Sequence, residues 1–348
     1  MMRFGSRTFD LSSNIPFVIA EIGVNHNGQL ELAHRLVLEA VACGADIVKF
    51  QLFRAEEEIS QHAPLAPYQE ASSEAVNQLD LVKALELSTE AMAALKAQCD
   101  ALNVGFLCSV FEHTSLASLD MILREKSVKF GSGEITNRPL LVEAARRGFD
   151  ILLSTGASTL AEVEEAYQTL RDARVRNLVL FHCVSSYPAP VEQQNLAAIS
   201  VLKKRFDVVI GYSDHSQGVE CALIALGLGA TVFEKHFTLD RSMPGPDHSA
   251  SADPAQFRDY VAKLKAGAVM LGSGVKTPMP CELPNIQLIR KGAVAKRTIE
   301  SGETLGEEDI LFKRPAFGID PREISCFLGK KVRRKITIDS PISSDDVE

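Results

Sequence analysis

The chain has 348 residues and a formal net charge of −8, and 46% of its residues are hydrophobic and 24% charged. This length suggests two domains, or one large barrel with an appendage. The negative charge disfavours nucleic acid and anionic membranes as partners, so an anionic substrate would require a local cationic site.

The seven cysteines are widely spaced and include no C-x-x-C pair, which favours reduced thiols over a disulfide framework or a zinc ribbon. The N-terminal segment lacks the apolar run of a signal peptide. The sequence also lacks an uncharged apolar stretch of about 18 residues, the length that a membrane span needs. We therefore expect a cytoplasmic protein.

Short apolar segments alternate with amphipathic ones along most of the chain. The eight predicted strands cover residues 17–21, 46–51, 104–109, 127–131, 151–155, 178–183, 208–214 and 231–237. The predicted helices cover residues 30–44, 88–102, 159–173, 217–230 and 253–271. The spacing breaks once, between Gln51 and Ser88, where residues 54–74 predict a long loop over one end of the barrel.

Eight strand–helix units are what a (β/α)₈ TIM barrel requires, so the predicted fold class is α/β with such a barrel over residues 1–271. A doubly wound sheet is the alternative, but no G-x-G-x-x-G opens a helix after the first strand. Residues 272–290 hold three prolines and two glycines and predict a linker. Residues 291–348 predict a small β-rich domain with strands at 292–299, 309–315 and 330–336.

Polar residues interrupt the apolar strands, mostly near the carboxyl end of each strand. In a barrel, alternate strand residues point inward and the chemistry sits at the carboxyl ends of the strands. Most of the polar residues fall on one parity, so we expect them to meet at one mouth of the barrel. They are Glu21, Lys49, Gln51, Lys129, Ser132, Glu134, Ser154, Ser213, His215, Glu234 and His236.

Lys49 and Lys129 predict a strongly cationic spot, which together with nearby serine hydroxyls would suit a phosphate group. Each lysine could instead pair with a neighbouring Glu or extend its ammonium group to solvent. His215 and His236 could hold a divalent cation that acts as a Lewis acid, or they could be hydrogen-bonded core residues. Glu21 is the most isolated inward carboxylate and a candidate general acid or base.

Several motifs resemble the sialic acid synthase family, which combines a TIM barrel with an antifreeze-like (SAF) domain. The barrel motifs are "IAEIGVNHNG" 19–28, "GADIVKFQ" 44–51, "VKFGSGE" 128–134, "LLSTG" 152–156, "HCVSSYPAP" 182–190, "GYSDHS" 211–216 and "EKHFTLDRSMPGPDHSAS" 234–251. The segment "RTIESGETLGEEDILFKRPAFGI" 297–319 resembles the SAF domain. The resemblance extends over essentially the whole chain from residue 15.

This resemblance implies an enzyme that joins phosphoenolpyruvate to an N-acetylhexosamine, typically N-acetylmannosamine, to form N-acetylneuraminate and phosphate. The implied reaction cleaves a C–O bond and requires a divalent metal. Mn²⁺ is the first candidate, and Mg²⁺ and Co²⁺ are the alternatives. The implied assembly is a domain-swapped homodimer in which Arg314 reaches into the partner subunit's barrel.

The resemblance also assigns roles to individual residues. It implies that Glu21 is catalytic together with Lys49 and Lys129, and that His215 and His236 bind the metal. The implied phosphoenolpyruvate contacts are Lys49, Gln51, Lys129, Ser132, Ser154 and Ser213. The implied sugar contacts are Glu134, Ser185, Tyr187, Asp247 and Arg314.

Two departures from the family pattern bear on the choice of sugar. Some members have Asn at the position of Ser185, and Gly is usual at the position of Ala316. The "AEIGVNHNG" form resembles both the neuraminate and the legionaminate branches. The alternative function is therefore a legionaminic acid synthase that acts on 2,4-diacetamido-2,4,6-trideoxy-mannose. N-acetylmannosamine 6-phosphate is a third candidate sugar.

Two further functions compete with this interpretation. The first is an aldolase that forms a Schiff base on Lys49, Lys129 or Lys235. The second is a carbohydrate-binding protein with an inactive barrel, in which the C-terminal domain would bind the sugar. The cluster of inward polar residues argues against this second function.

Overall fold

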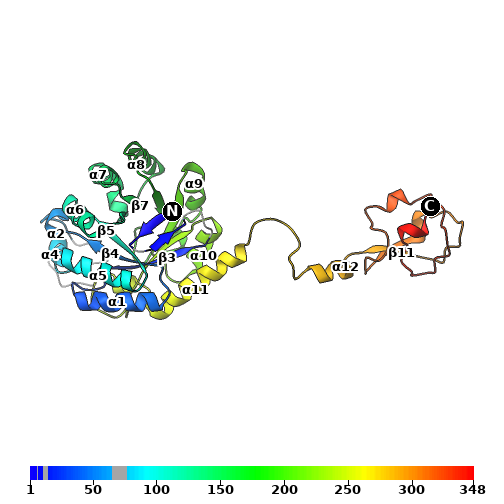
Figure 1. Ribbon diagram of the computed structural model, residues 1–348, viewed down its shortest axis with the longest axis horizontal. Helices are drawn as coiled ribbons and strands as arrows, with labels where there is room; N and C mark the ends of the chain where they lie inside the picture. Colours follow the sequence, from blue (N-terminus) through cyan, green and yellow to red (C-terminus); the bar gives the residue numbers. More distant parts are fainter. Residues whose placement is uncertain (6, 11–14, 65–76) are drawn as a thin grey trace. The chain divides into compact units, whose positions relative to one another are not determined.

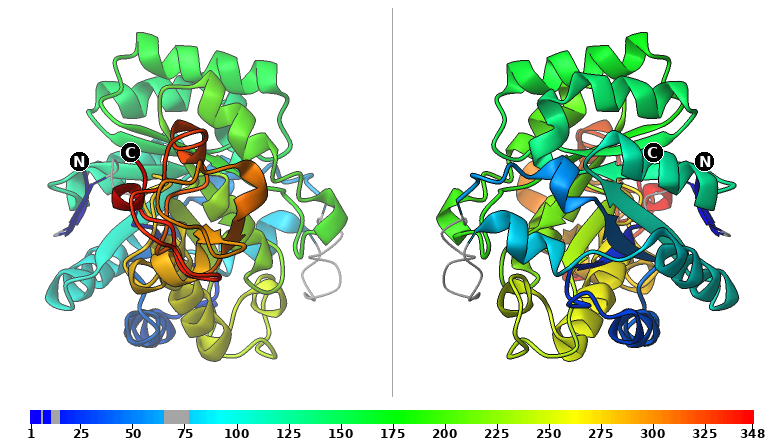
Figure 2. Two further views of the ribbon diagram at one scale, coloured as in Figure 1. Left: turned by 90° about the vertical axis from the view of Figure 1, so that its right-hand side faces the viewer. Right: turned by 90° about the vertical axis from the view of Figure 1, so that its left-hand side faces the viewer.

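The computed structural model describes residues 1–5, 7–10, 15–64 and 77–348. Contacts divide the chain into two units, Met1–Gly272 and Ser273–Glu348. In the first unit, helices surround a central set of strands (Figure 1 and Figure 2). Among the helices of the described ranges, none combines the length and the apolar character that crossing a membrane requires.

Eight parallel strands close into a barrel in the order β10-β3-β4-β5-β6-β7-β8-β9. Their bounds are β3 Phe17–Gly23, β4 Ile47–Leu52, β5 Gly105–Val110, β6 Ser127–Phe130, β7 Asp150–Ser154, β8 Leu178–His182, β9 Val209–Asp214 and β10 Val232–His236. All eight strands predicted for the barrel are present, and the TIM-barrel prediction is confirmed. The doubly wound alternative is wrong because β10 pairs with β3 and closes the sheet.

The long helices of the first unit lie outside the barrel. They are α1 Leu30–Ala42, α5 Thr89–Ala101, α6 His113–Ile122, α7 Arg138–Arg146, α8 Leu160–Asp172, α9 Ala198–Arg205, α10 Glu220–Gly227 and α11 Pro254–Leu271. The predicted loop after Gln51 contains the short helix α2 (Ala55–Glu58), and α4 (Gln78–Lys83) follows it. Residues 65–74 of that predicted loop lie outside the described residues.

An antiparallel hairpin that the sequence analysis did not predict closes the amino-terminal end of the barrel. Its strands are β1 (Met2–Phe4) and β2 (Arg7–Phe9). Met2 and Phe4 are fully buried. They pack against inward residues from the first half of the barrel strands, which include Phe17, Ile19, Ile47, Leu107, Leu152, Val179 and Val232. Apolar packing therefore fills this end and leaves the carboxyl ends of the strands for polar residues.

The second unit has its own small core, which includes Ala293, Ile299, Leu305, Val332 and Ile342. Strand β11 (Gly292–Ala295) pairs antiparallel with β12 (Ile310–Lys313). The strand predicted over 330–336 makes only isolated bridges, which include Ile299 to Ile336 and Val332 to Val347. The predicted linker contains the short helix α12 (Ile286–Ile289). The unit is the small β-rich domain that the sequence predicted.

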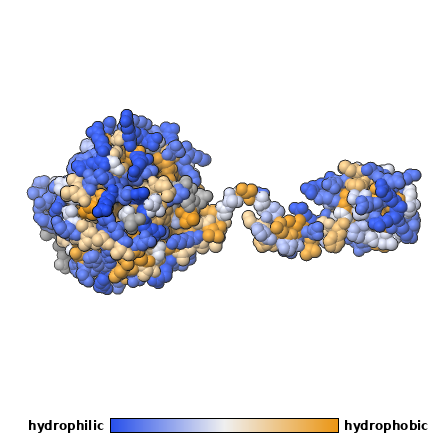
Figure 3. Space-filling model, in the orientation of Figure 1, coloured by the Kyte–Doolittle hydropathy of each residue, from blue (hydrophilic) through white to orange (hydrophobic). Residues whose placement is uncertain are grey.

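Exposed hydrophobic side chains are concentrated at the end of α11 and in the segment that follows it (Figure 3). The group comprises Val269, Met270, Leu271, Val275, Met279, Leu283, Leu288 and Ile289.

Alternation along β10 sends Lys235 to the outside of the barrel, between the strands and α11. Its ammonium group lies 3.1 Å from Asp214 Oδ2 and donates to the carbonyl oxygen of Ser216. It also lies 5.4 Å from the centre of the Tyr260 ring. Lys235 is therefore partnered on the outer face, while its neighbours Glu234 and His236 point inward.

Replacing Lys235 with Met should lower the free energy of unfolding by about 3–5 kcal/mol, because Asp214 would remain buried without its counter-ion. Denaturation followed by circular dichroism measures this change. The matched control is Lys263→Met, which removes an exposed lysine that lies 2.7 Å from Asp259 and should change stability little. Equal effects of the two substitutions would contradict the role of the buried pair.

Candidate active site

A cavity of about 250 Å³ lies at the carboxyl ends of the barrel strands. Strand register brings the inward residues of neighbouring strands side by side, since Glu21 pairs with Lys49 and with His236. The predicted site residues that line the cavity are Glu21, Lys49, Gln51, Lys129, Ser132, Ser154, Tyr187, Ser213, His215, His236 and Asp247. Residues far apart in the sequence thus share one cavity, as the strand parity predicted.

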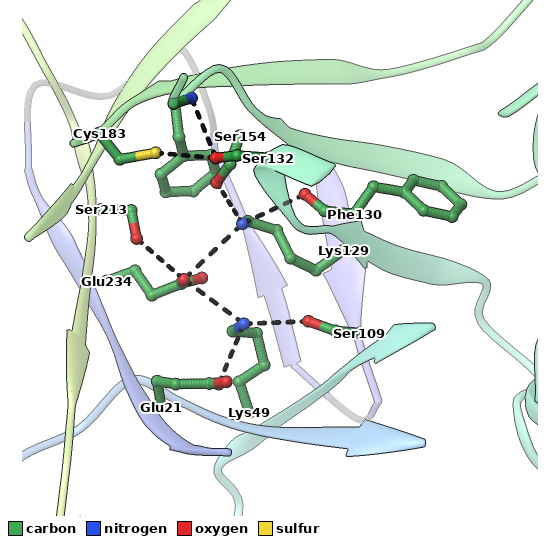
Figure 4. Close-up of polar contacts among 12 residues, drawn as sticks. Glu21, Lys49, Ser109, Lys129, Phe130, Ser132, Ser154, Cys183, Ser213 and Glu234 are labelled. Atoms are coloured by element: carbon green, nitrogen blue, oxygen red, sulfur yellow. Dashed lines mark hydrogen bonds and ion pairs between the residues drawn. The ribbon is translucent and has the colours of Figure 1, made fainter. Parts of the chain in front are cut away.

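Glu234 lies between the two inward lysines at the base of this cavity (Figure 4). Its Oε1 atom is 3.4 Å from Lys49 Nζ and 3.7 Å from Lys129 Nζ. Lys49 Nζ is also 3.0 Å from Glu21 Oε2. All four side chains are almost completely buried, so each charge depends on the others for stabilisation.

Hydroxyl groups complete this network. Lys49 donates to Ser109 Oγ at 3.0 Å, and Lys129 donates to Ser154 Oγ at 2.5 Å. Ser213 donates to Glu234 Oε1 at 3.1 Å. The ammonium groups and the bridging carboxylate are therefore held by polar contacts on several sides.

The network sets the charge states of its members. Burial alone would raise the pKa of Glu234, but Lys129 and Lys49 outweigh burial and hold this pKa at about 2. Burial would lower the pKa of Lys49, but the two carboxylates raise it, whereas burial lowers the pKa of Lys129. Burial raises the pKa of Glu21 to about 7, despite the opposing effect of Lys49. Glu21 is thus suited to proton transfer near neutral pH.

The expectation of a strongly cationic spot is wrong in one respect. The two lysines do lie close together, but Glu21 and Glu234 pair with them and balance much of their charge. The strand parity placed Glu234 among the inward residues and did not show that it reaches both lysines.

The two histidines at the cavity wall are neutral and close together. Their ring centres are 5.6 Å apart. Burial lowers the pKa of His215 to about 4 and the pKa of His236 well below its usual range. His215 Nδ1 lies 2.7 Å from the carbonyl oxygen of Val184, to which it donates, so its Nε2 carries a lone pair.

This pair fits a divalent cation. His236 Nδ1 is buried and has no hydrogen-bond partner among the described residues, and Asp247 Oδ2 lies 3.8 Å from it. In the described part of the chain, no group of three or more His, Cys, Asp or Glu residues is arranged as a metal-ligand set. Two neutral imidazoles would therefore hold a cation that keeps open positions for a substrate or water.

Only some of the residues implied for sugar binding line this cavity. The Tyr187 ring lies 4.2 Å from the His215 ring, and Asp247 also lines the cavity, where burial raises its pKa to about 6. Ser185 lines a neighbouring cavity of about 890 Å³. Glu134 lies in the turn after β6, where its carboxylate accepts from Asn137 Nδ2 at 2.7 Å, and it does not line the first cavity. Arg314 is an exposed residue of the second unit, directly after β12.

The candidate residues omitted several polar groups that line the cavity, among them Ser109 and Glu58. Ser109 ends a predicted strand on the inward parity, so that signal was available in the sequence. Glu58 lies in α2, where no strand parity could indicate its direction. Lys235, in contrast, lies outside this cavity, which removes it as a Schiff-base lysine here.

Residues 36–276 match the NeuB family, and residues 290–348 match the SAF domain. The N,N'-diacetyllegionaminic acid synthase of Campylobacter jejuni is 42% identical over 318 residues, which cover 90% of this chain and 94% of that protein. The N-acetylneuraminate-9-phosphate synthase of Mus musculus is 33% identical over 335 residues, which cover 95% of this chain and 92% of that protein.

A solved structure, the N-acetylneuraminic acid (sialic acid) synthetase of Leptospira borgpetersenii, superimposes with a TM-score of 0.72 at 33% identity. The match covers 82% of this chain and 96% of that one. The comparisons therefore confirm the resemblance that the motifs indicated. This chain belongs to the NeuB family and carries a C-terminal SAF domain.

Proposed function

We propose that this protein is a transferase that condenses phosphoenolpyruvate with the open-chain form of an N-acetylated mannose-type sugar and releases inorganic phosphate. The observation that carries this proposal is one cavity that contains two buried lysines, a carboxyl group with a pKa of about 7 and two neutral imidazoles. The free cysteines support a cytoplasmic location.

The proposed sugar is N-acetylmannosamine, which would give N-acetylneuraminate. A second candidate is 2,4-diacetamido-2,4,6-trideoxy-mannose, which would give a legionaminic acid. The second candidate is favoured by the identity of 42% to the Campylobacter jejuni legionaminic acid synthase, compared with 33% to the Mus musculus enzyme.

The base of the cavity would bind phosphoenolpyruvate. Lys49 and Lys129 would contact its carboxylate and phosphate, since ammonium groups and hydroxyls form strong hydrogen bonds to such oxygens. Glu234 holds the two ammonium groups on either side of one carboxylate oxygen and so fixes their separation. The other proposed contacts are Gln51, Ser132, Ser154 and Ser213.

The sugar would lie above this base. Tyr187 and Asp247 line the upper wall, and Asp247 would accept hydrogen bonds from sugar hydroxyls. His215 and His236 would hold a divalent cation, Mn²⁺ first and Mg²⁺ or Co²⁺ as alternatives, which when bound supplies Lewis-acid polarisation of a carbonyl oxygen. Positioning the two substrates would supply up to roughly 7–11 kcal/mol of the barrier reduction.

The bond changes follow from this arrangement. C3 of phosphoenolpyruvate forms a bond to the aldehyde carbon of the sugar, and C2 becomes electron-deficient. A water oxygen adds to C2 while Glu21 accepts a proton from it. The former aldehyde oxygen takes up that proton from Glu21. The bond between C2 and the phosphate-bearing oxygen then breaks, and its electron pair leaves with phosphate. The proton of the C2 hydroxyl group goes to phosphate as the ketone forms.

We further propose that a second copy of the chain completes the site. Arg314 would be delivered to the barrel of the partner in a domain-swapped homodimer and would contact the sugar there. Glu134 and Ser185, which belong to the barrel unit, are the other proposed sugar contacts. Exposed hydrophobic side chains at the start of the second unit support this assembly, because contact with another protein surface would bury them; they are Val275, Met279, Leu283, Leu288 and Ile289.

Phosphate release from phosphoenolpyruvate tests the reaction. We expect release with N-acetylmannosamine or with the 2,4-diacetamido sugar, none with phosphoenolpyruvate alone, and loss of activity with EDTA that Mn²⁺ restores. Absence of release with every sugar would contradict the proposal. Trapping of pyruvate on Lys49 or Lys129 by borohydride would instead support the aldolase, and sugar binding by residues 291–348 alone would support the binding protein.

The pH dependence tests the role of Glu21. The ionised carboxylate is the form that accepts a proton, so kcat/KM should rise as the pH increases through about 7. Glu21→Gln should bind phosphoenolpyruvate nearly as well, lose this rise, and turn over about 10²–10⁴-fold more slowly. Glu31→Gln, at an exposed position in the first turn of α1, is the control. Ordinary turnover in Glu21→Gln would rule out this role.

A further inference from the structure

The segment that follows β10 returns to its own start. The carbonyl oxygen of His236 accepts from the backbone N–H of Ala252 at 2.8 Å, and the N–H of Thr238 donates to the carbonyl oxygen of Ala252 at 3.0 Å. Residues 237–252 therefore form a loop with adjacent ends, which we call the β10 loop. Asp247 belongs to this loop, and its Oδ2 lies 3.8 Å from His236 Nδ1. This distance is too long for a hydrogen bond, so the loop backbone sets the separation of the two side chains.

The side chain of Asn25, in the turns after β3, contacts both ends of the β10 loop. It is fully buried. Its Nδ2 donates to the carbonyl oxygen of Phe237 at 2.9 Å and to Ser251 Oγ at 2.8 Å. Ser251 Oγ in turn donates to the carbonyl oxygen of Asp247 at 2.7 Å. One amide group thus connects the residue after His236 with the backbone of Asp247.

The chemistry of the partners fixes the direction of these hydrogen bonds. A backbone carbonyl oxygen can only accept, so Asn25 must present its NH₂ group to Phe237, and the single hydroxyl hydrogen of Ser251 must point to Asp247. The remaining Asn25 Oδ1 is buried and has no hydrogen-bond partner among the residues that the structure describes. A buried acceptor without a partner is unfavourable, so a contribution to stability does not by itself explain an amide at this position.

Other contacts attach the middle of the β10 loop to the same turns. Asn27 Nδ2 donates to the carbonyl oxygen of Pro244 at 2.8 Å. The ring of His248 lies between Asn27 Oδ1 and Thr238 Oγ1, with its nitrogens at 3.2 and 2.7 Å from these atoms. The β10 loop is therefore held along its length by the segment after β3, and Asn25 holds its ends.

We propose that Asn25 is a positioning residue that, through Ser251, sets the separation of His236 and Asp247 before a substrate binds. The inference rests on the proposed condensation, in which His236 would hold the cation and Asp247 would accept hydrogen bonds from the sugar. Asn25 does not line the cavity and acts through the backbone of the β10 loop. Without its amide group, the loop would shift and displace the upper wall of the cavity.

Steady-state kinetics of the full-length protein test this role. In Asn25→Ala and in Ser251→Ala, kcat/KM for the sugar that the unaltered protein converts should fall by about 10–100-fold, the usual effect of removing an outer support of a metal site. The Kd of phosphoenolpyruvate, measured by calorimetry, should stay within about twofold, since its proposed contacts lie on other strands. The double variant should lose about as much as either single variant, because both residues act through one chain of hydrogen bonds.

The matched control is Ser127→Ala, at the start of β6 and the opposite end of the barrel. Ser127 is as buried as Ser251, and its Oγ donates to the carbonyl oxygen of Arg3 at 2.5 Å. The control therefore removes the same kind of buried hydrogen bond and should leave kcat/KM unchanged. If Ser127→Ala lowers kcat/KM as much as Ser251→Ala does, the loss reflects general stability and the proposal is overturned.

Amide hydrogen exchange of the unliganded protein, followed by mass spectrometry, separates this inference from the proposed reaction. Asn25→Ala and Ser251→Ala should accelerate exchange in residues 237–252, because local opening of the loop becomes easier, and Ser127→Ala should not. Exchange in the other strands verifies that each variant is folded. Unchanged exchange in the loop overturns the inference, as does faster exchange with an unchanged kcat/KM. An unaltered protein that releases no phosphate contradicts the proposed function instead, and the exchange rates then decide whether Asn25 holds the loop.

Discussion

The carboxylate of Glu234, shared by two buried lysines, is the interaction on which the site depends. Two ammonium groups inside a barrel are unfavourable unless a counter-charge lies within a few ångströms. Glu234 supplies that charge from β10 to Lys49 on β4, which is separated from β10 only by β3, and to Lys129 on β6, on the opposite side of the barrel. Serine hydroxyls satisfy further donors, so the base of the cavity is both charged and ordered before any substrate binds.

The barrel supports this network by separating apolar and polar layers along its axis. The hairpin β1–β2 and the first inward residues of the strands fill the amino-terminal end with hydrophobic side chains. The next inward layers hold the charges. Outside the wall, Lys235 and Asp214 form a second buried pair against α11. Three consecutive residues, Glu234, Lys235 and His236, therefore contribute to two separate polar clusters because strand side chains alternate.

The same charge balance shapes what the cavity can accept. An anionic substrate that binds the lysines must share them with Glu21 and Glu234, so the site has limited capacity for negative charge. Neutral imidazoles and carboxyl groups occupy the upper wall.

The apolar segments and the alternation of side chains along them were sufficient to predict the barrel. They also placed Lys49, Lys129, His215 and His236 at one end of it. These features repeat along the sequence, and a closed sheet translates them directly into positions. Parity says which side of a strand a residue faces, but it gives no distance across the interior. The role of Glu234 as the partner of both lysines therefore became visible only in the tertiary structure.

Other features depended on the tertiary structure for similar reasons. The strands of the N-terminal hairpin have three residues each, too few for a periodic pattern, and the barrel interior stabilises them. Glu58 faces the cavity because Glu86 and Glu112 hold the start of its helix, a contact between segments that are separate in sequence. The sequence by itself determined which local elements form and which way their side chains alternate. The pairing of charges across the barrel and the placement of its loops were decided by long-range contacts, which no local pattern encodes.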